Sequence, residues 1–230
     1  MKHLLVKAQK QILKLVVEHY PQVYLVGGTA LSFYFNHRVS EDLDFFTQQY
    51  TAKLHKEITR YIKQKTGFPL VLVDEEKRNK FVKMAVYEFE INKDEFLKVD
   101  FVSDCTQLLK PRMKNGLASL EDIYYRKILA VIGFSGVESK VGKMLPGGRQ
   151  KTKDLYDLFY LSAHEVPLSS WFGKHFDQSS YERLTHWYLS IPKQKVVSEL
   201  LELVPKCDTR VLFKHLDDEI VHKLNREHFT

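Results

Sequence analysis

The sequence predicts an α+β protein in which a mixed β-sheet with flanking helices is followed by a C-terminal helical bundle. All strand-like segments lie before residue 103, and only helical periodicity is found from Ser119 onward. With 230 residues, 44% of them hydrophobic, the chain can bury the core of one large domain or two small ones. We expect one domain over residues 1–115 and a second, helical domain over residues 116–230.

The N-terminal half alternates between helical and strand periodicity. Apolar residues recur every three or four positions in the first helix, residues 3–19, which Pro21 ends. The next expected elements are a strand at 23–26, a helix from Thr29 to Phe35, a strand at 43–46 and a helix at 51–65. Further strands are expected at 70–73, 81–91 and 96–102, the last two joined by a hairpin turn at 92–95.

The C-terminal half contains helical periodicity alone. A helix is expected from Ser119, which is placed to cap it, to about Ile132. Further helices are expected at 152–164, 179–190, 193–203 and 209–227. The aromatic side chains of the 179–190 helix favour a place in the core over base stacking; they are Tyr181, Trp187 and Tyr188.

Composition excludes several classes of protein. Two distant cysteines, Cys105 and Cys207, form neither a disulfide framework nor a zinc site. The longest apolar run, Leu129 to Phe134, is far short of the ~20 residues that span a bilayer, and no signal peptide is recognisable. We therefore expect a soluble, cytoplasmic protein that does not associate with membranes.

The positive charge of the chain is concentrated in one segment. The formal net charge is +6, and residues 110–153 hold ten basic and three acidic side chains. Such a cationic zone suits phosphates or nucleic acid, because neutralised phosphates release counterions. The alternative is a solvated, lysine-rich surface.

Two glycines and two aspartates form the most informative motif of the chain. Gly27 and Gly28 end the first strand, where the backbone can approach a bulky anion and present N–H groups to it. Asp42 and Asp44 are two residues apart on the next strand, so their side chains point to the same face. Two carboxylates on one face are suited to hold Mg²⁺ against a triphosphate.

A third carboxylate is expected from a neighbouring strand. Asp100 lies in an otherwise apolar strand, where an unpaired charge would be costly, and it shares a face with Lys98 and Val102. Taken singly, these features also fit an ordinary turn, an acidic pair at a strand edge and a salt-bridged core residue. Together, in this order, they favour a catalytic metal site.

This arrangement resembles the nucleotidyltransferase superfamily, with its polymerase-β-like fold, and more closely the AbiEii-type nucleotidyltransferase toxin family. The first motif of that family looks like GGTAL…HRxSxDLDF, which is matched here by Gly27 to Leu31, His37-Arg38, Ser40 and Asp42 to Phe45. Two later helical motifs are matched by Lys127-Ile128-Leu129-Ala130 and by Lys153-Asp154-Leu155-Tyr156-Asp157-Leu158. The resemblance covers about residues 22–162.

The resemblance implies roles for individual residues. The implied metal ligands are Asp42, Asp44 and Asp100, which with Lys127 and Asp154 would also carry catalysis. The implied nucleotide-binding residues are Gly27, Gly28, Thr29, Ser40, Lys127 and Asp157. Lys153 departs from the family, where arginine is commoner; it keeps the charge but loses a bidentate contact.

The residue types of the later motifs also permit purely structural roles. Lys127 could extend along an apolar helix face toward solvent instead of contacting a phosphate. Asp154 and Asp157 could form a surface charge cluster with nearby lysines. Asp157 could also be a structural partner of Lys127 or Arg126.

The resemblance further implies a metal-dependent enzyme, using Mg²⁺ or Mn²⁺, that moves a nucleoside monophosphate from an NTP to an acceptor. It implies the toxin of a toxin–antitoxin pair, with RNA such as a tRNA 3′ end as acceptor, a cognate antitoxin as partner and a helical domain that closes the active-site cleft. The alternatives are transfer to a small molecule such as an antibiotic, transfer to a protein, and a non-catalytic nucleotide-binding module.

The segment 133–150 is long, glycine-rich and basic. We expect it to be mobile and to close over the polyanionic substrate, with Lys140, Lys143 and Arg149 as solvated contacts. The alternative is a passive linker whose lysines aid solubility.

Overall fold

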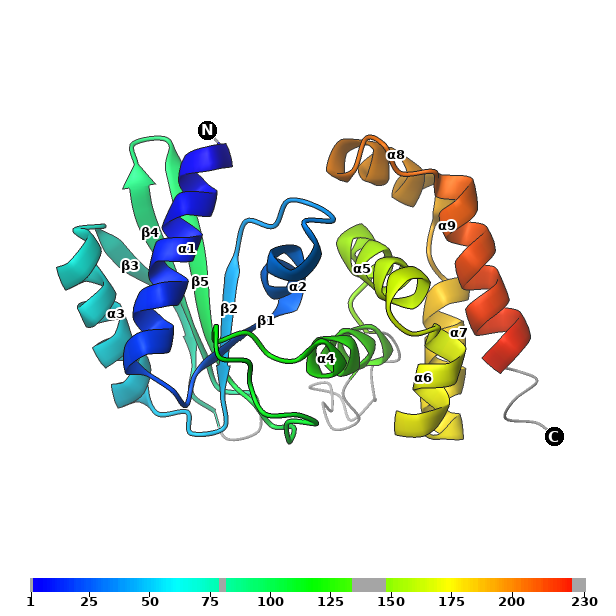
Figure 1. Cartoon of the computed structure of the whole chain (residues 1–230), viewed down its shortest axis with the longest axis horizontal. Coiled ribbons are helices and arrows are strands. Elements are labelled where there is room, and N and C mark those ends of the chain that lie inside the picture. Colours follow the sequence, from blue (N-terminus) through cyan, green and yellow to red (C-terminus); the bar gives the residue numbers. More distant parts are fainter. Residues whose placement is uncertain (1, 79–81, 134–147, 225–230) are drawn as a thin grey trace. The chain divides into compact units, whose positions relative to one another are not determined.

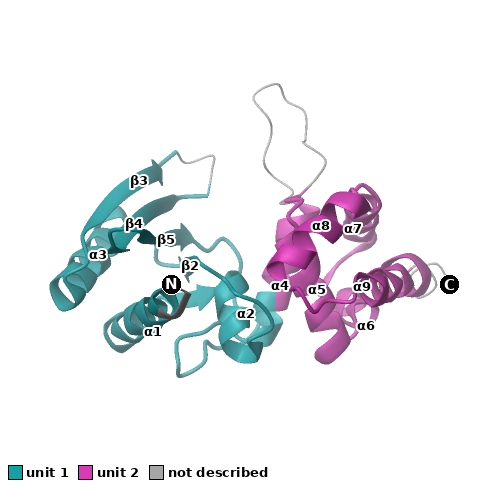
Figure 2. Ribbon diagram, turned by 90° about the horizontal axis from the view of Figure 1, so that it is seen from above, with its two compact units in different colours: residues 1–123 teal, residues 124–230 magenta. Residues whose placement is uncertain are grey.

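The computed structural model describes residues 2–78, 82–133 and 148–224 (Figure 1). The chain divides into two compact units, residues 1–123 (unit 1) and 124–230 (unit 2), coloured separately in Figure 2. The division falls inside helix α4, Leu120–Ile132, whereas the expected domain boundary, residues 115/116, lies just before that helix. A mixed sheet with flanking helices, followed by helices alone, confirms the predicted α+β class.

Unit 1 is built on a five-stranded sheet. Its strands are β1 (Tyr24–Val26), β2 (Leu43–Thr47), β3 (Leu70–Glu76), β4 (Met84–Asn92) and β5 (Glu95–Ser103), in the spatial order β1-β2-β5-β4-β3. β2 and β5 run parallel, and every other neighbouring pair is antiparallel. The parallel pairing brings together two strands that are separated in the chain by a helix and a hairpin.

One face of this sheet is covered by helices. Figure 1 shows α1 (Lys2–His19) and α3 (Ala52–Thr66) on the same side of the strands. Burial alternates along β2, where Leu43, Phe45 and Thr47 are buried and Asp44 is partly exposed. Because successive side chains of a strand point to opposite faces, Asp44 and Phe46 point away from the face on which Leu43 and Phe45 are buried.

The helix after β1 begins earlier than the sequence predicts. We expected Gly27 and Gly28 to break the chain before a helix at Thr29, but α2 spans Gly27–Phe35. Gly27 has a φ of +77°, a conformation that glycine adopts without steric cost. The glycine pair therefore forms the first turn of α2 directly after the strand.

Unit 2 is helical. After α4 it contains α5 (Thr152–His164), α6 (Leu168–His175), α7 (Gln178–Leu189), α8 (Lys193–Leu203) and α9 (Thr209–Leu216), which continues as the π-helical segment η1 (Asp217–Lys223). The expected core residues of α7 are buried; they are Tyr181, Trp187 and Tyr188. Helix α6 was not predicted, because its eight residues are too few to establish a helical period.

Ser119 caps the N-terminus of α4. The hydroxyl of Ser119 accepts a hydrogen bond of 3.0 Å from the backbone N–H of Asp122, as expected of the N-cap of α4. Within the described ranges, no helix combines the length and hydrophobicity needed to cross a bilayer.

Candidate active site

The first turn of α2 lies against the carboxylate of Asp44. A Cβ atom added to Gly27 would stand 2.5 Å from Oδ2 of Asp44, and one added to Gly28 would stand 2.2 Å from Nη2 of Arg38. A side chain at either position would therefore displace the carboxylate of Asp44 or the guanidinium of Arg38. The first N–H groups of a helix lack intrahelical partners and carry partial positive charge, so this turn can bind an anion.

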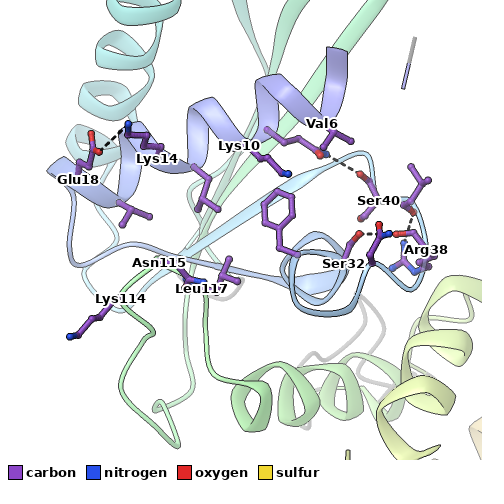
Figure 3. A pocket seen from close by; sticks show the side chains of 16 residues that line it. Val6, Lys10, Lys14, Glu18, Ser32, Arg38, Ser40, Lys114, Asn115 and Leu117 are labelled. Atoms are coloured by element: carbon purple, nitrogen blue, oxygen red, sulfur yellow. Dashed lines mark hydrogen bonds and ion pairs between the residues drawn. The ribbon is translucent and has the colours of Figure 1, made fainter. Parts of the chain in front are cut away.

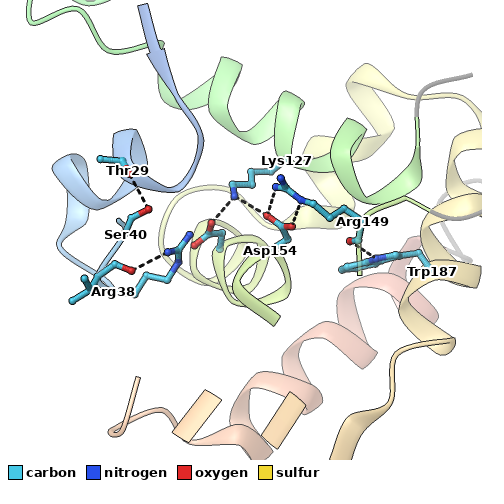
Figure 4. Close-up of polar contacts among 9 residues, drawn as sticks. Thr29, Arg38, Ser40, Lys127, Arg149, Asp154 and Trp187 are labelled. Atoms are coloured by element: carbon cyan, nitrogen blue, oxygen red, sulfur yellow. Dashed lines mark hydrogen bonds and ion pairs between the residues drawn. The ribbon is translucent and has the colours of Figure 1, made fainter. Parts of the chain in front are cut away.

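Thr29 and Ser40 connect this turn to the segment that follows α2. The hydroxyl of Thr29 donates to the backbone carbonyl of Asp42 and lies 2.8 Å from the hydroxyl of Ser40 (Figure 4). From α1, the buried Gln9 donates to the carbonyl of Ser40 at 2.9 Å. These bonds fix the backbone that leads into Asp42. Thr29 and Ser40, which were predicted to bind nucleotide, thus hold that backbone against the first turn of α2.

The predicted carboxylates belong to two adjacent strands. Asp44 on β2 is directly opposite Asp100 on β5 in the parallel register. Residues paired in this way point to the same face of the sheet. Asp42 immediately precedes β2, and Asp100 is buried.

Lys98 brings a positive charge to these carboxylates. Its Nζ forms an ion pair of 2.5 Å with Oδ2 of Asp100. Burial by itself lowers the pKa of Lys98, but the hydrogen bond and charge of Asp100, with the charges of Asp42 and Asp44, raise it overall. All three carboxylates thus act electrostatically on one ammonium group.

The chemistry of these donors fits a hard divalent cation. Carboxylate oxygens are the ligands that Mg²⁺ prefers, and it usually takes only one or two of them from the protein. In the ranges that the structure describes, no three side chains of His, Cys, Asp or Glu are already gathered as ligands of one ion. A cation held by one or two of these aspartates would take its remaining ligands from water or from a bound substrate.

The later motifs form a second group of charges, within unit 2. Lys127 on α4 forms ion pairs of 2.9 Å with Asp154 and 2.6 Å with Asp157, both on α5 (Figure 4). The side chains of all three are almost completely buried. Lys127 therefore does not extend toward solvent, and Asp154 and Asp157 are not a surface cluster.

Arg149 completes this group. Its Nε and Nη2 donate to the two oxygens of Asp154 at 2.6 and 2.7 Å, a bidentate contact. The backbone N–H of Arg149 donates to Ala130, and a Cβ atom on Gly148 would stand 2.0 Å from the carbonyl oxygen of Val131. The close approach of Gly148 to the end of α4 thus brings Arg149 to Asp154.

Part of the expectation for segment 133–150 is wrong. Arg149 is not a free loop charge: its side chain is 44% exposed, but its guanidinium is bound to the buried carboxylate of Asp154. Trp187 also donates to the backbone carbonyl of Arg149 at 3.2 Å. Lys140 and Lys143, with the expected closure of this segment, lie outside the described residues.

The cations around Asp154 overcome the cost of burying it. Burial raises the pKa of this carboxyl, but the charge of Lys127 and the hydrogen bonds and charge of Arg149 lower it overall, below its ordinary value. Asp154 is therefore ionised in the folded protein near neutral pH.

The sequence assigned no role to Lys98 and a different role to Arg149. Lys98 was recognised as sharing a face with Asp100, and the alternation of the strand was a sufficient signal for their pairing. No pattern in the sequence indicated the bidentate contact of Arg149 with Asp154. That contact forms because the segment before α5 packs against the end of α4.

Comparisons with known proteins identify the family and the fold of the chain. The family model "Nucleotidyl transferase AbiEii toxin, Type IV TA system" matches residues 14–226. The fold is similar to that of JHP933 from Helicobacter pylori, with a TM-score of 0.58 and 23% identity over 97% of this chain and 93% of that one. A candidate nucleotidyltransferase from H. pylori gives a TM-score of 0.57 and 22% identity, over 96% and 93% of the two chains. No curated protein matches the sequence.

Proposed function

The chain belongs to the AbiEii family of nucleotidyl transferase toxins, and from this we propose that it transfers a nucleoside monophosphate from an NTP to RNA in a metal-dependent reaction. The observation that supports the proposal most directly is the register that pairs Asp44 with Asp100 beside the glycine turn of α2. Carboxylates next to an anion-binding turn suit a phosphoryl group that must be held and attacked.

The proposed reaction forms one bond and breaks one. A hydroxyl oxygen of the acceptor attacks the α-phosphorus, the bond from that phosphorus to the bridging oxygen breaks, and pyrophosphate leaves. The backbone N–H groups of Gly27 and Gly28 bind the triphosphate, and Asp100 takes up the proton of the attacking hydroxyl. Asp42, Asp44 and Asp100 would hold Mg²⁺ or Mn²⁺, which would supply charge neutralisation at the transferred phosphate.

For the charges of unit 2 we propose a supporting role in the same reaction. Lys127 neutralises the β- and γ-phosphates, as the family resemblance implies, and Asp157 contributes to nucleotide binding. Asp154 and Arg149 act as positioning residues that hold the ammonium of Lys127 in one orientation. A buried ion-pair network with several hydrogen bonds restricts the side-chain positions in this way.

The proposed acceptor is the 3′ end of a tRNA, and the proposed biological role is that of a toxin with a cognate antitoxin in the cytoplasm. The basic residues of segment 110–153 support a polyanionic acceptor. Expression of the chain alone should then arrest growth, and Asp44→Asn should relieve the arrest. Growth arrest that persists in this variant would contradict a toxicity that depends on transfer.

The activity itself is tested with each of the four α-³²P-labelled NTPs, Mg²⁺ and deproteinised tRNA. We expect one or more NTPs to label the tRNA, and Asp44→Asn to lower the rate by about 10²–10³-fold without loss of fold. Asp94→Asn, in the exposed hairpin turn, is the matched control. Label that enters a small molecule or a protein instead of tRNA would overturn the proposed acceptor, and an unchanged rate in Asp44→Asn would overturn the proposed site.

A further inference from the structure

Unit 1 contains a groove that none of the proposed roles above uses. Its volume is about 790 Å³, and it lies between α1, the end of α2, the segment 36–40 and the turn 114–117 (Figure 3). Its apolar lining includes Leu13, Val17, Phe33 and Leu117. A volume of this size accommodates a ligand of several hundred daltons.

The polar rim of this groove is basic. It is lined by Lys10, Lys14 and Lys114, and Glu18 is its one acidic residue among those that the structure describes. Glu18 lies 3.9 Å from Lys14, in an exposed pair. Lys10 and Lys114 form no ion pair with any acidic residue of segments 2–78, 82–133 and 148–224, so their charges are available to an anionic ligand.

One end of the groove adjoins the candidate active site. Arg38 and Ser40 line the groove, and their side chains also stand where a Cβ on Gly28 would be. Ser40 precedes Asp42 by two residues, which places the two Cα atoms within about 7 Å of each other. Ser40 therefore connects the lining of the groove to the residues that lead into β2.

We propose that this groove binds the unpaired end of the acceptor RNA and directs its terminal hydroxyl past Ser40 toward Asp42. The inference rests on the proposed function and adds the route by which the acceptor enters. Single-stranded nucleic acid is bound by cations that follow its backbone and by aromatic rings on which its bases stack.

The lining provides both kinds of contact. Lys10 and Lys14 are one helical turn apart, about 6 Å, and so can contact successive phosphates. Phe33 is half-buried and offers its ring to a base. An acidic peptide would also neutralise the lysines, but it would not explain why the groove ends at the residues around Gly28.

The test measures the binding of a fluorescein-labelled, single-stranded RNA octamer by anisotropy over a series of KCl concentrations. In the double variant Lys10→Gln/Lys114→Gln, two phosphate contacts are lost. The slope of log affinity against log salt should therefore become less steep by about 1.4. Phe33→Leu keeps an apolar side chain but loses stacking, and it should weaken binding about fivefold or more at every salt concentration.

The matched control is Lys63→Gln/Lys93→Gln, which removes two exposed lysines from α3 and the β4–β5 turn. It should reproduce the wild-type affinity and slope. Melting temperatures should agree across these lysine variants, because exposed charges contribute little to stability.

The proposal is overturned if the groove variants bind the octamer with the wild-type affinity and slope. It is also overturned if they lose affinity for a polyglutamate peptide and not for RNA, because the groove would then dock a protein. Transfer to tRNA by the wild-type protein is measured in parallel. If transfer occurs while groove variants bind RNA normally, the groove assignment alone fails; if no RNA is bound or labelled, the proposed acceptor fails.

Discussion

Lys98 has a specific electrostatic position among the aspartates of unit 1. Three carboxylates around one ammonium group would repel each other strongly if that cation were absent. The ion pair with Asp100, and the charges of Asp42 and Asp44, place the ammonium of Lys98 where it offsets that repulsion. A divalent cation bound to the same oxygens would compete with this ammonium.

This competition gives a prediction for Lys98→Met. Without the ammonium, the metal-free protein should lose about 1 kcal/mol of unfolding free energy, since a partly exposed pair is only moderately stabilising. The affinity for Mg²⁺ or Mn²⁺ should rise about tenfold, because the cation no longer displaces a bound charge. Thermal unfolding over a range of MnCl₂ concentrations measures both effects.

The control for this prediction is Lys93→Met, an exposed lysine in the hairpin turn. It should leave the dependence of melting temperature on MnCl₂ unchanged. Equal metal affinities of Lys98→Met and the wild type would show that the ammonium does not compete for the carboxylates.

Gly27 and Gly67 permit a paired test of close packing. Their φ values are +77° and +75°, so alanine is strained at either position, by about 1 kcal/mol. Only at Gly27 would the new Cβ also meet Asp44; at Gly67 no atom lies within 4 Å. Both variants should lose similar backbone stability, but only Gly27→Ala should displace the carboxylate and abolish transfer.

Urea unfolding and the transfer assay, applied to both variants, distinguish these effects. If Gly67→Ala loses as much activity as Gly27→Ala, general destabilisation accounts for the loss. In that case the contact of Gly27 with Asp44 has no particular role.

At the scale of elements, buried charges join α4 to α5. Asp154 accepts hydrogen bonds from Lys127 on α4 and from Arg149, which precedes α5. Removal of one partner of such a group leaves buried charge without compensation and typically costs about 3–5 kcal/mol. The contacts that organise the proposed catalytic lysine are therefore also part of what holds these two helices together.

The ion pairs of Asp154 predict how the free energy of unfolding depends on pH. The pKa of Asp154 is lower in the folded protein than its ordinary value. Its ionisation therefore stabilises the fold above about pH 4, and this contribution is lost as the pH falls through the folded pKa. The difference in unfolding free energy between the wild type and Asp154→Asn should be large at pH 7 and should shrink below about pH 4.

Urea unfolding between pH 7 and pH 3 measures this difference, with Asp94→Asn as an exposed control. The control should differ little from the wild type at every pH. A difference between wild type and Asp154→Asn that stays constant over this range would contradict the lowered pKa.

At the scale of the whole molecule, the two units depend on apolar packing. Large side chains fill the cores of both, among them Phe45 and Phe89 in unit 1 and Phe172, Trp187 and Tyr188 in unit 2. Two of the proposed metal ligands, Asp44 and Asp100, lie at strand positions whose neighbours supply this packing, and Asp42 immediately precedes β2. The fold should therefore not require the metal.

Removal of divalent cations tests whether the fold is independent of the metal. After treatment with EDTA and dialysis, the circular dichroism spectrum should be unchanged and the melting temperature should fall by less than about 2 °C. Transfer of labelled nucleotide should cease and should return on addition of MgCl₂. A cooperative loss of helical signal in EDTA would instead identify a structural metal.

Much of this architecture follows from the sequence because it depends on local patterns. Apolar spacing predicts α1 and α3, and the absence of strand signals after Ser119 predicts the helical unit. The first motif, residues 27–45, together with the two later helical motifs predicted the family, and the family model confirms it. Short or irregular elements were not predictable in this way: α6 has eight residues, and α2 begins at a glycine that normally ends a helix.

Other features were decided by tertiary structure alone. Asp44 and Asp100 are opposite each other because β5 pairs in parallel with β2, and no local pattern specifies which strands become neighbours. Arg149 reaches Asp154 because Gly148 packs against the last turn of α4. The physical reason is the same in both cases: secondary structure depends on residues a few positions apart, whereas ion pairs between distant segments form only after apolar packing has brought those segments together.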